Sequence, residues 1–92
     1  MPLNQQVTFK TNLRTASRFA VPRVIRGQFK LEPTQILKIT VTLTDILSNR
    51  EIFFGKMRKD GYITIPPIAV AALKQGGESL ESQPIEVIVE PA

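Results

Sequence analysis

The chain has 92 residues and a net charge of +4, and 42% of its residues are hydrophobic. A chain of this length forms one domain around a single core, and this hydrophobic content argues against general disorder. It contains no cysteine and no histidine, which excludes disulfides and thiolate chemistry and removes the most common general base and zinc ligand. No apolar run approaches the roughly 20 residues that cross a bilayer, and residues 1–6 do not resemble a signal peptide. We therefore expect a cytoplasmic, non-membrane protein that is not an enzyme, with no catalytic residues, metal site or cofactor.

The charges are unevenly distributed along the chain. Residues 1–30 contain six basic residues and no acidic residue, whereas residues 75–92 contain four acidic residues and no basic one. A basic region of this kind favours an anionic partner. The alternative is that strand and helix surfaces simply carry solvated charges.

The first half of the chain predicts a strand, a second strand, a helix and a third strand, at residues 7–10, 18–21, 23–30 and 37–43. The strands are indicated by apolar and polar side chains that alternate with a period of two, most regularly in the third strand. Pro22 ends the second strand because proline has no N–H group to donate. In the helix, Val24, Ile25 and Phe29 are spaced to share one face, which we expect to be buried.

The second half predicts the same order of elements, at residues 51–57, 62–65, 68–75 and 85–90. Asp60-Gly61 predicts a turn before the second of these strands, because glycine accepts a positive φ without steric cost. Pro66-Pro67 stops that strand, and the fixed φ of proline suits the first turn of the helix that follows. Gly76-Gly77 ends the helix. The side chains that this helix is expected to bury are Ile68, Ala69, Ala72 and Leu73.

The two halves are an internal repeat. When the sequence is shifted by 44 positions, Val21-Pro22 aligns with Ile65-Pro66, and the final strands align with a shift of 48. Neither half is able to bury its own sheet face, so the halves are expected to close on each other. We therefore predict a single mainly β (α+β) domain over residues 1–92, in which repeat 1 (about 5–47) and repeat 2 (about 50–91) form a six-stranded β-barrel with pseudo-two-fold symmetry. Because both half-barrels are on one chain, we expect a monomer.

The apolar positions of these elements indicate the core. We expect it to contain Phe29, Leu37, Ile39, Val41, Ile65, Leu73 and Val87. Phe53 and Phe54 are adjacent, so they point to opposite faces of their strand. We expect both faces to be covered within the domain.

The segment Lys56–Pro67, which reads K-M-R-K-D-G-Y-I-T-I-P-P, precedes an apolar helix and a strand that reads I-E-V-I-V. In this order it resembles the AbrB/SpoVT-type DNA-binding module, in which a basic residue and a turn lead to Gly-Arg, three apolar-biased residues, a proline, a helix, a Gly-Asp turn and a final strand. Two copies in tandem on one chain more closely resemble the single-chain cradle-loop barrels of archaea, which are called RIFT barrels. The resemblance implies a cradle-loop barrel and DNA binding, and related barrels include archaeal riboflavin kinases and translation-factor domains.

Each repeat keeps part of the family pattern. The position four residues before the proline, usually arginine in the family, is Arg18 in the first repeat and Tyr62 in the second. The turn glycine is Gly61 in the second repeat, where the first repeat has Ser17.

The leading functional hypothesis is binding of duplex DNA by a transcriptional regulator or chromatin-associated protein. Basic side chains of the two strand–strand connections and of the first helix are expected to contact phosphates. These residues are Arg14, Arg18, Arg23, Arg26, Lys56, Arg58 and Lys59. Arg26 and Lys30 are four residues apart, so we expect them to share one face of the helix. The alternative for residues 56–59 is a solvated hairpin tip, and we expect little sequence preference because no base-reading element is evident.

Two other hypotheses concern different partners. The first is a non-catalytic site for a small ligand or nucleotide in the cradle loops, at residues 75–78. This loop has two glycines but lacks the pattern of a P-loop or a dinucleotide fingerprint, so its alternative is a helix C-cap followed by a flexible connection. The second is a protein-interaction module, in which Phe53 or Phe54 is exposed for a partner.

Overall fold

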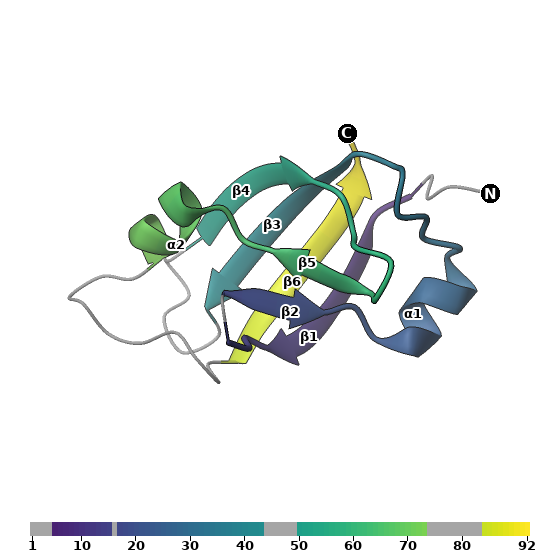
Figure 1. Cartoon of the computed structure of the whole chain (residues 1–92), viewed down its shortest axis with the longest axis horizontal. Coiled ribbons are helices and arrows are strands. Elements are labelled where there is room, and N and C mark those ends of the chain that lie inside the picture. Colours follow the sequence, from purple (N-terminus) through teal and green to yellow (C-terminus); the bar gives the residue numbers. More distant parts are fainter. Residues whose placement is uncertain (1–4, 16, 44–49, 74–83) are drawn as a thin grey trace.

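The computed structural model describes residues 5–15, 17–43, 50–73 and 84–92 of the chain (Figure 1). In these residues the order strand, strand, helix, strand occurs twice. The first set is β1 (Val7–Asn12), β2 (Arg18–Ala20), α1 (Arg23–Gln28) and β3 (Leu37–Leu43). The second set is β4 (Arg50–Gly55), β5 (Tyr62–Thr64), α2 (Pro67–Leu73) and β6 (Pro84–Pro91). Each predicted strand and helix is therefore present, with bounds that differ from the prediction by a few residues.

The strands form two antiparallel sheets. One has four strands in the order β1-β6-β3-β4, and the other is a two-stranded ribbon of β2 and β5. In Figure 1 the ribbon lies across one face of the larger sheet, with α1 at one end of the molecule and α2 at the other. The protein is thus a mainly β domain with two helices. The ribbon and the larger sheet are hydrogen-bonded as separate sheets, so closure into one six-stranded barrel stays a prediction.

The strand registers relate the two halves of the chain. β1 pairs with β6 so that Phe9 lies opposite Val87, and β4 pairs with β3 so that Phe53 lies opposite Ile39. Phe53 comes 44 residues after Phe9, and Ile39 comes 48 residues before Val87. These are the two shifts that align the repeats in the sequence. The pair β1–β6 therefore corresponds to the pair β4–β3, with the first and second halves of the chain exchanged.

The hydrophobic core lies between the larger sheet and the ribbon. Phe19 and Ile63 are opposite each other in the middle of the ribbon, and both are fully buried. The ring of Phe19 lies 6.3 Å from the ring of Phe9, which belongs to the facing sheet. Burial of one such side chain contributes about 1.5–3 kcal/mol. The predicted core residues Leu37, Ile39, Val41, Ile65, Leu73 and Val87 are confirmed as buried.

The buried face of α1 was predicted wrongly in part. Val24 is 73% exposed, and no residue of α1 is fully buried. Ile25 and Phe29 are partly buried and pack against the core. α1 has only six residues and lies at the rim of the core, so it contacts the core along one narrow face. Val24 is outside this face.

The buried face of α2 also differs from the prediction. Ala69 and Leu73 are buried, whereas Ile68 is 84% exposed and Ala72 is exposed. Residues four apart lie on one side of a helix, and a neighbouring residue is rotated by about 100° from them. The predicted helix end at residues 74–77 lies outside the described residues. Neither described helix is long and apolar enough to cross a membrane.

The two adjacent phenylalanines of β4 have opposite environments. Phe53 is 8% exposed and faces the core, whereas Phe54 is 62% exposed on the other side of the strand. The expectation that both faces are covered within the domain is wrong for the part of the chain that the structure describes. The ribbon covers one face of the sheet, and Phe54 is on the opposite one.

We predict that the same substitution has very different effects at these two positions. Phe53→Ala should lower the free energy of unfolding by about 3–5 kcal/mol, because it removes a buried ring and leaves a cavity. Phe54→Ala should lower it by less than about 1 kcal/mol, because the ring is largely in water already. Urea titrations of both variants measure the difference, and equal losses would show that the faces of β4 are misassigned.

Candidate nucleic-acid interface

The outer side of the ribbon presents polar and charged side chains away from the core. Strand side chains alternate between two faces, so the burial of Phe19 and Ile63 turns their neighbours outward. The side chains on this outer side, which we call the ribbon face, are those of Arg18, Ala20, Tyr62 and Thr64. All four are partly or fully exposed.

Arg18 and Tyr62 are in contact on the ribbon face. The guanidinium carbon of Arg18 lies 4.8 Å from the centre of the Tyr62 ring, which is a cation–π geometry. The Nε atom of Arg18 is buried and has no hydrogen-bond partner among the described residues. The ring therefore holds the guanidinium across the ribbon, and the two side chains occupy equivalent positions of the repeats, 44 residues apart.

A turn with a basic residue lies at each end of the ribbon. The Arg14 N–H donates to the Arg18 carbonyl at 2.7 Å, and the Arg58 N–H donates to the Tyr62 carbonyl at 2.8 Å. Arg58 comes 44 residues after Arg14, so the two arginines have the same place in their repeats. Because β2 and β5 are antiparallel, these turns are at opposite ends of the ribbon. Both arginine side chains are exposed.

Each turn is tied to the other half of the chain by a backbone hydrogen bond. The Ile65 N–H donates to the Ser17 carbonyl, and the Val21 N–H donates to the Gly61 carbonyl, both at 2.9 Å. Ser17 has φ 54° and Gly61 has φ 86°, so both turns use the left-handed region. The position of each basic turn is thus set by the strand of the opposite repeat.

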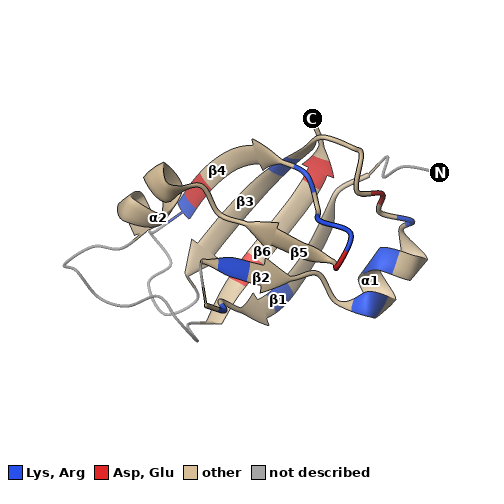
Figure 2. Ribbon diagram, viewed as in Figure 1, with Lys and Arg blue, Asp and Glu red and all other residues tan. Residues whose placement is uncertain are grey.

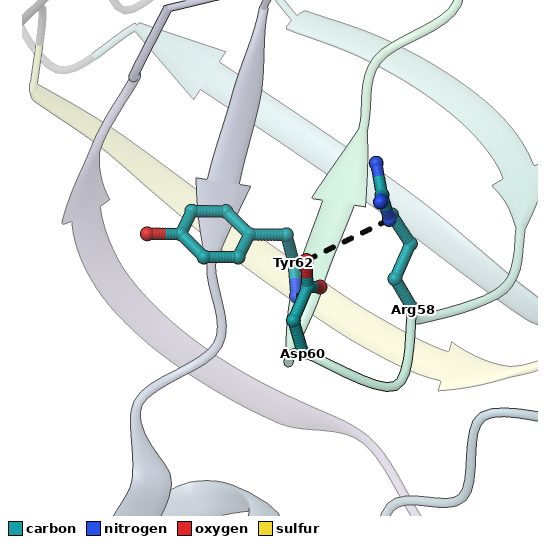
Figure 3. Close-up of polar contacts among 3 residues, drawn as sticks. All are labelled: Arg58, Asp60 and Tyr62. Carbon is teal, nitrogen blue, oxygen red and sulfur yellow. Dashed lines mark hydrogen bonds and ion pairs between the residues drawn. The ribbon is translucent and has the colours of Figure 1, made fainter.

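The turn around Gly61 is further stabilised by Asp60 (Figure 3). One carboxylate oxygen of Asp60 accepts a hydrogen bond from the Tyr62 N–H at 3.1 Å, and the other lies 3.7 Å from Arg58 Nε. A side chain that accepts from the backbone two residues on is typical of an Asx turn. The ion pair is exposed and contributes at most about 1 kcal/mol, so Arg58 remains available to an anion.

Arg26, which is predicted to contact phosphate, also has contacts within the protein. Its Nε donates to the Val21 carbonyl at 3.2 Å, and a Cβ atom on Gly61 would lie 2.6 Å from its Cζ. The guanidinium of Arg26 therefore lies directly on the turn around Gly61. This contact joins α1 to the basic turn, and Arg26 is half-buried as a result.

Lys30 does not share a helical face with Arg26. α1 ends at Gln28, and Lys30 adopts φ 53° beyond it. The Leu31 N–H donates to the Arg26 carbonyl at 3.1 Å, which is the hydrogen bond of a Schellman-type helix ending. The four-residue spacing predicted a continuing helix, whereas the helix ends before Lys30.

The seven predicted phosphate contacts fall into two groups. Figure 2 shows basic residues on the turns at both ends of the ribbon and on α1. Arg14 and Arg18 are joined by the backbone bridge at one end. The remaining five are on α1 and on the connection between β4 and β5, and they are Arg23, Arg26, Lys56, Arg58 and Lys59. The two connections therefore do not form one cluster, and they lie at either end of the ribbon face.

Sequence reasoning missed Tyr62 and Thr64 as members of this surface. The period of two in β5 places them on the face opposite Ile63, and the repeat aligns Tyr62 with Arg18. These signals identify the face once the pairing of β2 with β5 is known. That pairing joins residues far apart in the sequence.

An open groove of about 530 Å³ lies beside the turn around Gly61. It is lined by Pro33, Thr34, Met57, Arg58, Lys59 and Asp60. The loop at residues 75–78, where the sequence placed a ligand site, lies outside the described residues. The described residues contain no group of three or more His, Cys, Asp or Glu side chains that is suited to a metal ion.

We predict opposite effects for two glycine-to-alanine substitutions. Gly61→Ala should lower the free energy of unfolding by about 1–2 kcal/mol or more, because φ is positive there and the new Cβ meets the Arg26 guanidinium. Gly27→Ala should raise it by about 0.5–1 kcal/mol, because Gly27 is helical and its Cβ would meet nothing within 4 Å. Thermal and urea unfolding of the two variants compare them directly.

The double variant Arg26→Ala/Gly61→Ala tests the contact itself. If Arg26 lies on Gly61, the cost of Gly61→Ala should be smaller when Arg26 is already absent. Strictly additive losses would show that the two residues do not contact each other.

The sequence matches no protein-family model and no curated protein. The fold is similar to that of PHS018 from Pyrococcus horikoshii, whose solution structure superposes with a TM-score of 0.76 at 18% sequence identity. The match covers 91% of this chain and 88% of that chain. At this level of identity the similarity shows a shared fold.

Proposed function

We propose that this protein binds duplex DNA through the ribbon face and the basic turns at its two ends. The observation that carries the proposal is the arrangement of Arg14 and Arg58. They hold equivalent exposed positions at opposite ends of a ribbon whose outer side carries Arg18 and Tyr62. Asp60 is the one acidic residue among the described residues of the ribbon and its two turns, and it is paired with Arg58.

The shape of the ribbon suits a DNA groove. The major groove of B-DNA is about 12 Å wide and admits a two-stranded β-ribbon. In this arrangement Arg18 and Thr64 face the base edges, while Arg14, Arg58 and Lys59 contact phosphates on either side. Arg23 on α1 and Lys56 in the connection between β4 and β5 extend the phosphate contacts. Arg26 supports the turn and is proposed as a further phosphate contact beside it.

Most of this binding comes from charge, so we propose little sequence preference. Arginine and lysine contacts to phosphate carry no sequence information, and one outward arginine is too few to read a site of several base pairs. The function that fits such binding is transcriptional regulation or DNA organisation, as the resemblance to AbrB/SpoVT-type modules implies. The resemblance to single-chain cradle-loop barrels supports closure of the six strands into a barrel, and the presence of both half-barrels on one chain supports action as a monomer.

A second candidate is a small anionic ligand in the groove beside the turn around Gly61. Arg58, Lys59 and the Thr34 hydroxyl line this groove and suit a phosphate group. Inorganic phosphate or a nucleoside monophosphate that competes with DNA at millimolar concentration would support it. The DNA proposal is favoured because this groove includes neither Arg14 nor Arg18.

We predict a steep salt dependence of DNA binding that depends on both turns. With about four to six phosphate contacts, affinity for a mixed-sequence duplex of about 20 base pairs should fall by roughly two to three orders of magnitude between 50 and 200 mM salt. Arg14→Ala/Arg58→Ala should reduce the salt slope by about two units, one for each lost contact. Fluorescence anisotropy over a salt series measures both quantities.

Arg50→Ala is the matched control, because Arg50 is an exposed arginine on β4 and not on the ribbon. It should leave the salt slope unchanged. The DNA proposal is wrong if no binding is seen at 50 mM salt. It is also wrong if the Arg14→Ala/Arg58→Ala variant and the Arg50→Ala control bind equally well.

A further inference from the structure

The larger sheet has a second face, which is turned away from the ribbon. On β4 this outer sheet face carries Ile52, which is 51% exposed, and Phe54, while Phe53 between them is in the core. Ile52 lies opposite Thr40, and Thr40 also lies opposite Ile88 of β6. The apolar side chains Ile52 and Phe54 are therefore at the outermost strand of a sheet that no described helix or strand covers on this side.

β4 is also an edge strand. Its one hydrogen-bonded neighbour among the described residues is β3. The other side of such a strand presents N–H and C=O groups that are able to pair with an added strand. Natural edge strands are usually protected by charges in the middle, by proline or by a bulge. β4 has one inward-facing charge, Glu51, and is contacted by α2, while its outer side carries Ile52 and Phe54.

On the outer side of β4 the charges are at the two ends and are positive, whereas Glu51 is partly exposed on the inner side of the strand. Arg50 begins β4 and Lys56 follows its last residue, and both are exposed. Lys38 lies opposite Phe54 and is paired with Glu90 at 4.0 Å, so it is partly neutralised. Along its outer side β4 therefore reads cation, isoleucine, phenylalanine, cation at every second position.

We propose that the β4 edge docks an extended segment of another protein, added as a fifth strand to the sheet. Charge complementarity defines the chemistry of the segment, which carries an acidic residue at each end and apolar residues at alternate positions between them. The added backbone pairs with β4, the apolar side chains pack on Ile52 and Phe54, and the acids lie next to Arg50 and Lys56. This surface shares Lys56 with the proposed DNA contacts, whereas Arg50, Ile52 and Phe54 are outside the ribbon and its turns.

A second copy of this chain fits the edge less well. The antiparallel register that places Ile52 of one copy opposite Phe54 of the other also places Arg50 opposite Lys56. Like charges directly opposite each other destabilise a strand pair. The other edge strand, β1, carries exposed Lys10 on its outer side and has the same sign of charge.

Titration of the full-length protein with synthetic peptides tests the proposal. The probe is a blocked heptapeptide, Glu-Thr-Val-Thr-Val-Thr-Glu, and the control peptide has lysine in place of both glutamates. Amide chemical shifts in two-dimensional NMR spectra should change along β4 and at Lys56 with the acidic peptide. A short added strand buries less surface than a stable protein complex, so we expect a dissociation constant on the order of 0.1–1 mM. Binding of the basic peptide should be at least about tenfold weaker.

Two variants sharpen the test. Phe54→Thr keeps a residue that favours strands and should weaken binding of the acidic peptide by about fivefold or more. Arg50→Glu/Lys56→Glu should reverse the preference between the two peptides. Arg58→Ala, which removes a charge of the proposed DNA surface, should leave peptide binding unchanged. Spectra of each variant show at once whether it is folded.

Three outcomes would overturn the proposal. In the first, the two peptides bind β4 equally, so the charges play no role, or neither peptide shifts the β4 amides at millimolar concentration, so the edge binds no added strand. Shifts appear on the ribbon face around Arg18 and Tyr62, which means that the acidic peptide only replaces phosphate there. Signals of β4 depend on protein concentration without peptide, which makes a second copy the occupant.

Discussion

The two reciprocal hydrogen bonds between the repeats are the constraint on which the rest of this structure depends. Val21 and Ile65 are the last residues before Pro22 and Pro66, so theirs are the last strand N–H groups that remain to be satisfied. Both residues are buried, and each donates to the turn of the opposite repeat. A buried N–H without a partner costs about 1–3 kcal/mol, which makes these bonds obligatory for the fold. They place the two basic turns at fixed positions at the ends of the ribbon.

The ribbon in turn closes the core. Phe19 and Ile63 point from its middle toward the larger sheet, where Phe9 meets Phe19. Because strand side chains alternate, the same packing that buries these residues forces Arg18 and Tyr62 outward. The proposed DNA surface is thus a direct consequence of how the core is covered. The opposite side of the larger sheet receives no such cover among the described residues, and Phe54 is exposed there for the same geometric reason.

The repeats share a backbone but differ in their side chains, and the candidate site depends on the differences. Equivalent positions hold Arg18 and Tyr62, and their contact across the ribbon needs one cation and one ring. Arg26 lies on Gly61, whereas the position 44 residues later is Val70, which packs against the core. A chain with two identical repeats would not make the contact between Arg18 and Tyr62. The two ends of the ribbon are therefore inequivalent, with most of the basic residues at the α1 end.

The sequence by itself determined the local elements and their order. Alternation with a period of two defined β3 at Leu37–Leu43, prolines marked the ends of β2 and β5, and the shifts of 44 and 48 agree with the observed strand pairs. These properties depend on residues that are close in the chain or on a comparison of the chain with itself.

Only the tertiary structure decided which other elements each face of a strand or helix contacts. The pattern at Phe53 and Phe54 shows that they point in opposite directions, but the position of the ribbon decides which one is buried. In the same way, a four-residue spacing relates Arg26 to Lys30, while the left-handed Lys30 and the turn around Gly61 decide that Arg26 binds the protein itself. The physical reason is that periodicity reports the polarity of a local element, whereas burial and contact depend on partners that are distant in sequence.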